Sequence, residues 1–371
     1  MTNSRRFRDT HRADLFYCDD MVCWKTTWRQ NMSRTAVCSF VLMLLFGIAD
    51  SSQSQDIPLI SGGAGFLTQT NGGNTTYIPT VAPVLEFPIS DRVLIESKAN
   101  LLESVFPRPN RGYDTSHYVA LAYLQADLQM TSHTTITGGY FYTPFNTFIE
   151  RLSPFWINNF TDGPLISSIG IGSPSGSALG GMVRGNAFQN RTISITYDAY
   201  FSAKTANEQF SSKRLLGDRV SFFFPKLGLE AGTSFNRILQ GKRSNNAGVH
   251  LWWTPPNSRF RFRSEYAHSA HAQGYWVEFA SQLTDSGDTA GPLERLEPVF
   301  RFQQTLRNAR DSTDGLPVAN TQRADFGLNY RLKHELRINT SYSRRFSSTG
   351  NTNIWQTGVV YRFLFPAWRS K

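Results

Sequence analysis

The sequence lacks apolar runs long enough for a bundle of membrane helices. A transmembrane helix needs about 20 consecutive apolar residues, and the one strong apolar run, VCSFVLMLLFGI from Val37 to Ile48, is much shorter. Only 40% of the 371 residues are hydrophobic, and the mean hydropathy is -0.34. Interior membrane helices are therefore excluded, whereas membrane-spanning strands, in which apolar and polar residues alternate, are not.

The sequence is also poor in cysteine. Its three cysteines, Cys18, Cys23 and Cys38, all lie before residue 55. An exported chain that starts near residue 55 would contain no cysteine and would need no disulfide. Cys38 lies at the front of the apolar run and not at its end, which argues against a lipid-modified cysteine.

The apolar run has the layout of a secretory signal, because a basic start precedes it and the small polar residues ADSSQSQ follow it. We expect residues 32–54 to be a signal peptide that is cleaved after Ser54, with a non-cleaved membrane anchor as the alternative. Residues 1–31 contain several aspartates, which do not belong before an export signal. Met32 is a more natural initiator, so we interpret residues 1–31 as a mis-called N-terminal extension.

What the chain does contain is a repeated alternation of apolar and polar side chains. The clearest example is RADFGLNYRLKHELRINTSYSRRF, from Arg323 to Phe346. A period of two is the geometry of a β-strand, because successive side chains point to opposite faces. This segment therefore predicts two antiparallel strands joined by a turn at residues 333–335.

The alternation continues through residues 55–371, in segments of about 8 to 14 residues that are separated by turn-forming clusters. It predicts sixteen strands. The first strand and the 181–189 strand are the weakest, so fourteen is the alternative count. The predicted strands are 60–69, 77–88, 92–104, 117–130, 133–144, 181–189, 192–203, 219–225, 227–239, 247–254, 258–268, 273–283, 295–306, 322–332, 336–346 and 354–365.

Two classes of all-β protein fit this alternation. In a soluble secreted β-sandwich the apolar face is a core, whereas in an antiparallel transmembrane β-barrel it faces lipid and the polar face lines a lumen. Connection lengths favour the barrel, because short periplasmic turns and long extracellular loops alternate in such proteins. A closed barrel also leaves no sheet edge unpaired in hydrocarbon. The longer loops are predicted at 105–116, 145–180, 204–218, 307–321 and 347–353.

The end of the chain, GVVYRFLFPAWRSK, resembles the assembly signal in the last strand of outer-membrane barrels. Tyr361 and Phe363 match its ending of Tyr, any residue, Phe, although eight residues follow Phe363. The resemblance implies that the barrel-assembly machinery inserts the chain into the outer membrane.

A second segment, GGYFYTPFNTFIERLSPFW, is similar to the strand-to-loop segment of the phosphate-selective porin family. Pro144, Phe145 and Glu150 match it, whereas Asn146 replaces the usual glycine. The resemblance covers under a tenth of the chain. It implies a bacterial outer-membrane porin-like barrel, and porins often form homotrimers.

In a porin the polar faces of the strands line the pore. We expect the lumen to be mostly basic, because arginine and lysine outnumber aspartate and glutamate on these faces. A positively lined passage attracts anions, so the sequence predicts passive diffusion of small hydrophilic solutes with a preference for anions. Paired wall charges with little net selectivity are the alternative. The pore-lining candidates are Arg92, Lys98, Arg259, Arg261, Arg263, Arg331, Arg337, Arg345 and Arg362.

The long segment 145–180 contains Glu150, Arg151 and Asp162 and the run GSPSGSALGG. By resemblance to general porins, it is expected to fold inward and narrow the pore, with a plain surface loop as the alternative. The Gly/Ser run is not a phosphate-binding P-loop, because no Gly-Lys-Ser/Thr follows it.

Signals for catalysis and metal binding are weak. His268 and His271 lack the further ligands that a metal site needs, and there is no Gly-x-Ser-x-Gly elbow. We expect no enzyme, no metal and no organic cofactor. The expected partners are outer-membrane lipid and small solutes, with no nucleic acid. A non-channel barrel, either an adhesin or a structural protein, is the remaining alternative within the membrane class.

Overall fold

The computed structural model describes most of the chain from residue 58 to residue 367. The expected N-terminal extension, 1–31, and the expected signal peptide, 32–54, lie outside the described residues. Among the described residues, no helix is long and apolar enough to span a membrane. The gaps within the described part are 109–111, 172, 174, 206, 242, 284–290, 310–313 and 333.

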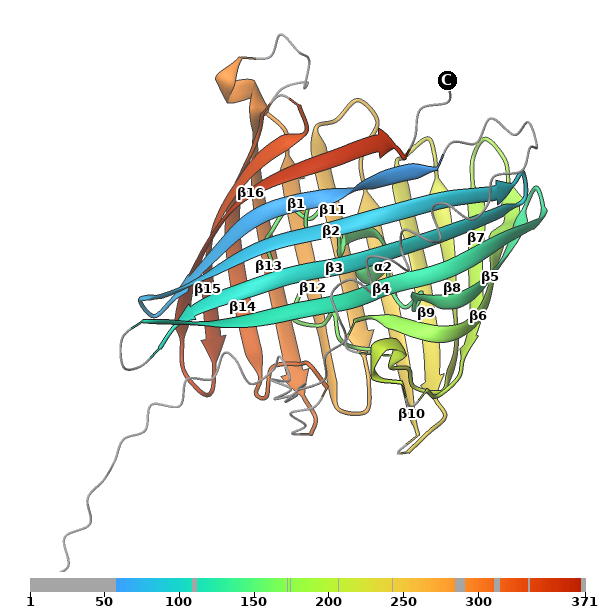
Figure 1. Ribbon diagram of the computed structural model, residues 1–371, viewed down its shortest axis with the longest axis horizontal. Helices are drawn as coiled ribbons and strands as arrows, with labels where there is room; N and C mark the ends of the chain where they lie inside the picture. Colours follow the sequence, from blue (N-terminus) through green and yellow to red (C-terminus); the bar gives the residue numbers. More distant parts are fainter. Residues whose placement is uncertain are drawn as a thin grey trace, which may run out of the picture. The chain divides into compact units, whose positions relative to one another are not determined.

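Sixteen antiparallel strands close into one barrel (Figure 1), in which each strand pairs with its sequence neighbours and β1 pairs with β16. The predicted count of sixteen is confirmed, and the alternative of fourteen is wrong. The strands are β1 (Leu59–Asn71), β2 (Asn74–Ser90), β3 (Val93–Pro107), β4 (Tyr113–Thr131), β5 (Thr134–Tyr142), β6 (Ser177–Gln189), β7 (Ser194–Ser202), β8 (Leu215–Phe224), β9 (Leu229–Ile238), β10 (Ser244–Trp253), β11 (Phe260–His268), β12 (Ala272–Ser281), β13 (Leu296–Arg307), β14 (Thr321–Arg331), β15 (Leu336–Ser347) and β16 (Thr352–Pro366). Among the described residues, three short helical segments accompany the strands: α2 (Phe148–Leu152), η1 (Glu208–Phe210) and η2 (Pro292–Arg295).

The barrel wall is apolar outside and polar inside. On β14, Phe326 is 57% exposed, whereas Arg323 and Asp325 on the opposite face are 2% and 0% exposed. A barrel in hydrocarbon requires this arrangement, because the outward side chains contact lipid and every backbone group pairs within the closed sheet. The soluble sandwich is therefore wrong, and the alternation in the sequence is that of a transmembrane barrel.

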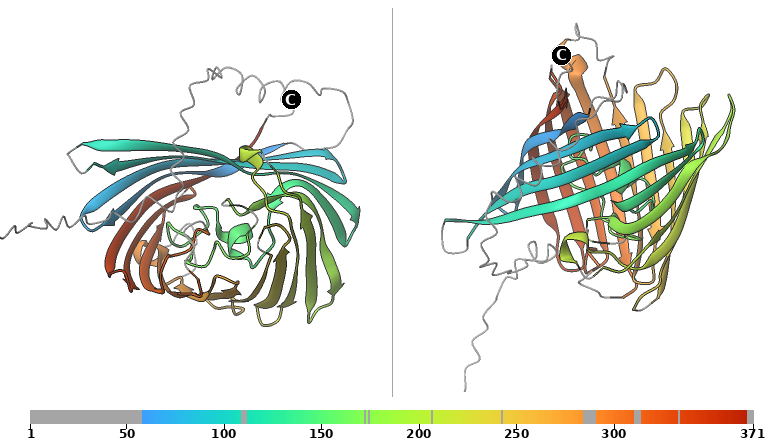
Figure 2. Two further views of the ribbon diagram at one scale, coloured as in Figure 1. Left: turned by 90° about the horizontal axis from the view of Figure 1, so that it is seen from below. Right: turned by 45° about the vertical axis from the view of Figure 1, so that its right-hand side comes forward.

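Strands β1 to β4 differ from the rest of the barrel wall in length and direction. They include the two longest strands, β4 with 19 residues and β2 with 17, and they cross the β8–β14 side at a wide angle (Figure 1). Seen along the barrel, β1 to β4 form a flat side, and the connection between β5 and β6 lies inside the ring of strands (Figure 2, left).

The connections differ from the prediction in two places. The β5–β6, β7–β8 and β13–β14 connections are long, as expected, but the loops predicted at 105–116 and 347–353 are short, at 108–112 and 348–351. The reason is that the flanking strands pair almost to their tips, with Pro107 opposite Tyr113 and Arg345 opposite Thr352. We call the end of the barrel with the β2–β3 and β14–β15 turns the turn end.

Candidate pore constriction

The β5–β6 connection, residues 143–176, enters the barrel and is called the inner loop. Glu265 on β11 holds its beginning. The Glu265 Oε1 accepts hydrogen bonds from the backbone N–H groups of Thr147, at 2.8 Å, and Phe148, at 2.9 Å, and from the Thr147 hydroxyl. Its Oε2 accepts one from the Trp276 Nε1–H at 3.1 Å. The first backbone N–H groups of a helix have no partner within the helix, and this buried carboxylate accepts from two such groups at the start of α2.

Glu150 on α2 attaches the inner loop to the β6–β8 wall. Its Oε2 lies 2.7 Å from Arg219 Nη1 on β8, and its Oε1 lies 3.9 Å from Arg184 Nη1 on β6. Burial would raise the pKa of Glu150, but the positive charge of Arg219 and its hydrogen bond outweigh burial and hold this pKa below its ordinary value. Glu150 is therefore an ionised anchor at neutral pH.

Asp162 attaches the inner loop to β13 and β14, which lie across the lumen from the β6–β8 wall. Its Oδ1 accepts a hydrogen bond from Arg301 Nη2 at 2.9 Å, and its Oδ2 accepts one from Arg323 Nη1. Burial raises the pKa of Asp162, but the charges of Arg323 and Arg301 lower it by more than burial raises it. The pKa of Asp162 therefore also lies below its ordinary value. Both arginines also contact Asp325, which completes an alternating charge network.

Apolar packing and small wall residues also hold the inner loop against the barrel wall; we call the wall surface that receives the loop its seat. Phe145, Phe148 and Leu152 are buried in one cluster with Trp276. A Cβ on Gly63 would come within 2.5 Å of Trp156, and one on Gly65 within 3.0 Å of Phe155. Similar close approaches occur at Gly248 with Asn146 and at Gly327 with Phe160. Because β1, β10 and β14 lie on different sides of the barrel, the inner loop reaches across the lumen.

Two cations flank the part of the inner loop that rests on β1. Lys98 on β3 is 5.1 Å from the ring centre of Trp156 and 3.3 Å from the Tyr142 hydroxyl. Arg337 on β15 donates from Nη2 to the carbonyl oxygens of Phe155, at 3.1 Å, and Asn158, at 2.7 Å. Within the part of the chain that the structure describes, neither cation has a carboxylate partner.

Three predicted pore-lining arginines gather at the turn end of the β11–β14 wall, which we call the basic wall. Arg261 and Arg331 share the two oxygens of Glu297, with Arg331 at 2.8 Å. Arg263 lies 3.6 Å from Glu278 and 5.0 Å from the ring centre of Trp252. Carboxylates therefore neutralise part of the charge that the sequence predicts for this wall.

The structure places the other predicted site residues apart from this cluster. Arg345 lies on β15 at the end of the barrel opposite the turn end, where its Nε donates to the Thr352 hydroxyl at 3.0 Å. Arg362 is exposed near the turn end, 3.9 Å from Glu335. The remaining positions are Arg92 in the β2–β3 turn, Arg259 in the turn before β11, and Arg151 on the inner loop, 2.8 Å from Glu230.

The sequence did not identify Arg184 and Arg219, the two arginines that form ion pairs with Glu150. Arg219 shares a strand face with Leu215 and Gly217, so no continuous polar face identifies it. Arg184 stands among glycines in GGMVRGN, where the alternation is weak. The wall glycines gave no signal either, because a glycine that makes room for a distant loop looks like any other.

His250 on β10 is the nearest approach to a hydrolytic arrangement. Its Nε2 lies 3.3 Å from the Ser221 hydroxyl and 3.5 Å from Glu230 Oε1. A catalytic base uses one ring nitrogen for the nucleophile and the other for its carboxylate, whereas here both partners meet the same nitrogen. The buried Nδ1 has no hydrogen-bond partner in the described part of the structure.

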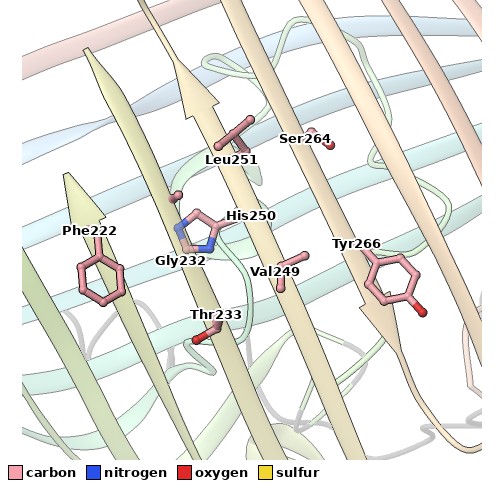
Figure 3. Close-up of a pocket in the computed structure, with 9 residues that line it drawn as sticks. Phe222, Gly232, Thr233, Val249, His250, Leu251, Ser264 and Tyr266 are labelled. Atoms are coloured by element: carbon pink, nitrogen blue, oxygen red, sulfur yellow. The ribbon is translucent and has the colours of Figure 1, made fainter. Parts of the chain in front are cut away.

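An outward groove of about 390 Å³ lies next to this histidine. Figure 3 shows the His250 ring beside Gly232, with Phe222, Val249 and Tyr266 around it. These last three side chains are exposed on the apolar outer face of the barrel. The groove therefore opens toward lipid and is no part of the lumen. Among the described residues, no cluster of histidine, cysteine, aspartate or glutamate is arranged to hold a metal ion.

Comparisons with known proteins identify the fold. No protein-family model matches the chain, and no curated protein matches it in sequence. Among solved structures, OmpF of Salmonella typhi in complex with daunomycin has a TM-score of 0.53 at 13% identity, over 83% of this chain and 97% of that one. Outer-membrane expressed OmpT of Vibrio cholerae has a TM-score of 0.53 at 10% identity, over 84% of this chain and 100% of that one. An anion-selective porin from Comamonas acidovorans has a TM-score of 0.50 at 9% identity, over 83% of this chain and 99% of that one. The chain thus shares the fold of outer-membrane porin-like β-barrels.

Proposed function

We propose that the protein is an outer-membrane porin, a channel for passive diffusion of small hydrophilic solutes. The observation that carries the proposal is the inner loop, which ion pairs attach to opposite sides of a polar lumen and which therefore narrows it. A structural barrel needs no such anchoring, and an adhesin would present its long loops outward. Glu150, Arg151 and Asp162 are the constriction residues, and they act by fixing the loop.

We propose in addition that the channel prefers anions. Lys98 and Arg337 support this preference, because they flank residues 155–158 of the inner loop without carboxylate partners among the described residues. Cations beside a narrow aqueous passage attract anions and repel cations. The basic wall adds to the same field, although Glu278 and Glu297 reduce its contribution.

Conductance of the purified full-length chain in a planar lipid bilayer tests both statements. We expect stepwise current increases in potassium chloride, and a reversal potential of the anion-selective sign when the salt concentration differs between the two sides. A cation-selective reversal potential would overturn the anion preference alone. A correctly folded barrel that carries no current would favour the adhesin or structural alternative.

The location and assembly of the chain are part of the same proposal. Export through a signal peptide at residues 32–54, insertion by the barrel-assembly machinery through Tyr361 and Phe363, and a homotrimer in the outer membrane fit a porin. Electrophoresis before and after heating checks the barrel, because a folded barrel changes its mobility when it is boiled. Mild detergent without heating keeps a trimer together, so a monomeric band under those conditions contradicts the trimer.

We also propose that the protein is not an enzyme. The geometry at His250 supports this, since Ser221 and Glu230 compete for one ring nitrogen. Hydrolysis of short-chain esters by the purified barrel gives the test. Activity that disappears in a Ser221→Ala variant would contradict the proposal.

A further inference from the structure

A second charged region lies on the part of the barrel wall that contains few of the predicted pore-lining arginines. A cavity of about 690 Å³ opens on strands β1 to β6 at the turn end, and we call it the side cavity. Its volume is within the range of small-molecule binding sites. Its charged lining residues are Glu86, Asp91, Arg92, Glu96, Asp127 and Arg184.

One pair of these charges is already neutralised. Arg184 Nη2 lies 3.1 Å from Asp127 Oδ2. Asp127 also accepts hydrogen bonds from the Thr137 hydroxyl and from Gln125 Nε2, the latter at 3.0 Å. Its oxygens are therefore satisfied by the protein, and neither Asp127 nor Arg184 needs a solute to balance its charge.

Glu86 and Glu96 are in the opposite situation. They stand directly across from each other in the β2–β3 register, and like charges in that position destabilise a sheet. Glu96 accepts one hydrogen bond, from Gln125 Nε2 at 3.0 Å, but this amide carries no charge. In the part of the chain that the structure describes, no lysine or arginine forms an ion pair with Glu86, Glu96 or Asp91. The nearby charge of Arg184 acts on Glu96, but no cation among the described residues contacts either of the facing carboxylates, so the wall balances them only in part.

The remaining charge in the side cavity is Arg92, in the β2–β3 turn. Its side chain is exposed, and no carboxylate contacts it among the described residues. The unbalanced charges are thus three carboxylates and one guanidinium. Their complement is a small molecule with two positive groups and one carboxylate, which is the charge pattern of a basic α-amino acid.

We propose that the side cavity binds a basic α-amino acid, such as arginine or lysine, as it passes through the channel. Glu86 and Glu96 receive its side-chain cation, and Arg92 receives its α-carboxylate. The proposal deepens the porin function, and the claim that the amino acid passes through the channel rests on that function. The binding itself rests only on the side cavity. Preference for simple anions is set elsewhere, beside the inner loop, so one lumen holds both properties.

Current recordings in planar bilayers test the proposal on the full-length chain. After a steady potassium chloride current is established, we expect L-arginine to interrupt it at concentrations where L-citrulline, which has the same shape but a neutral side chain, has no effect. Agmatine, which lacks the carboxylate, should act more weakly than arginine. Calorimetric titration of L-arginine into the detergent-solubilised barrel gives the affinity without any need for conductance.

Variants assign the effect to the side cavity. We expect the double substitution Glu86→Gln and Glu96→Gln to weaken arginine binding at least tenfold, and Arg92→Gln to abolish the difference between arginine and agmatine. Glu103→Gln, on β3 but outside the cavity, is the matched control and should bind as the unmodified chain does. Heat-dependent gel mobility verifies that each variant is folded.

The outcomes separate the two proposals. A conducting channel that shows neither current interruptions nor calorimetric binding with arginine overturns the side-cavity site and leaves the porin function intact. Equal binding by the unmodified chain and the double variant also overturns the site. A folded barrel that binds arginine but carries no current overturns the porin function, and the site then stands as a binding site on the wall.

Discussion

Arg301 on β13 contacts Asp162 of the inner loop at two points, through the carboxylate at 2.9 Å and through the backbone carbonyl oxygen at 3.1 Å. The arginine side chain is fully buried, whereas about a quarter of the aspartate remains exposed. A two-point contact fixes the direction of the loop backbone as well as its distance from the wall. This pair therefore fixes both the position and the direction of the inner loop at Asp162.

Substitution of Asp162 tests that dependence. We expect Asp162→Asn to loosen the inner loop and destabilise the barrel by about 1–3 kcal/mol, because Arg301 and Arg323 lose a charged acceptor. Single-channel recordings should show larger and noisier currents. Asp114→Asn, which removes an exposed ion pair with Arg108, is the control and should change neither property. Unchanged current noise in the Asp162 variant would contradict the anchoring role.

Acid should release the inner loop. The pKa values of Glu150 and Asp162 are lowered from their ordinary values of 4.5 and 3.8, so the docked loop takes up protons less readily than the free loop. This contribution to docking is complete above those ordinary values and is lost as the pH falls through the lowered ones. Current amplitude measured from pH 7 down to pH 3 should change only in the acid part of the range.

The double variant Glu150→Gln and Asp162→Asn provides the control for the acid response. It should behave at neutral pH as the unmodified chain does in acid, and it should lose most of the pH dependence. A transition centred near neutral pH would show that other groups control the loop.

The alternation of residue types was enough to predict the fold, but much of the site could not be predicted. A period of two fixes the face of each side chain, so the outward position of Phe326 and the inward position of Arg323 follow from the sequence. The contact between Asp162 and Arg301 joins residues 139 positions apart, and no local pattern encodes such a partner. For the same reason, the sequence left open whether cations such as Arg261 and Arg331 are paired, whereas the structure shows that Glu297 neutralises part of their charge.

Gly63 tests the seat of the inner loop on β1. A Gly63→Ala substitution places a methyl group within 2.5 Å of the Trp156 ring, so we expect the loop to shift, at a cost of about 1–3 kcal/mol. A thermal melt and the single-channel current both report the change. Trp156→Ala in the same chain should remove most of the penalty. Gly138→Ala, where the added methyl group meets nothing within 4 Å, controls for the loss of glycine in a strand.

Lys98 and Arg337 should set the ion preference. One unpaired charge contributes about 1 kcal/mol to an ion at 4 Å in water, so we expect Lys98→Met or Arg337→Gln to lower the anion-to-cation permeability ratio by up to about fivefold. Reversal potentials in a salt gradient give the ratio. Arg362→Gln, at an exposed position near the end of the last strand, should leave it unchanged. An equal fall in all three variants would mean that total charge, and not position, controls the preference.

The glycine seats also impose an order of events on folding. Gly63 belongs to the first strand and Gly327 to the fourteenth, so the surface that receives the inner loop is complete only when β1 has paired with β16. Contacts between residues so far apart in sequence form late and slowly. We therefore expect the inner loop to complete its docking only after the barrel has closed.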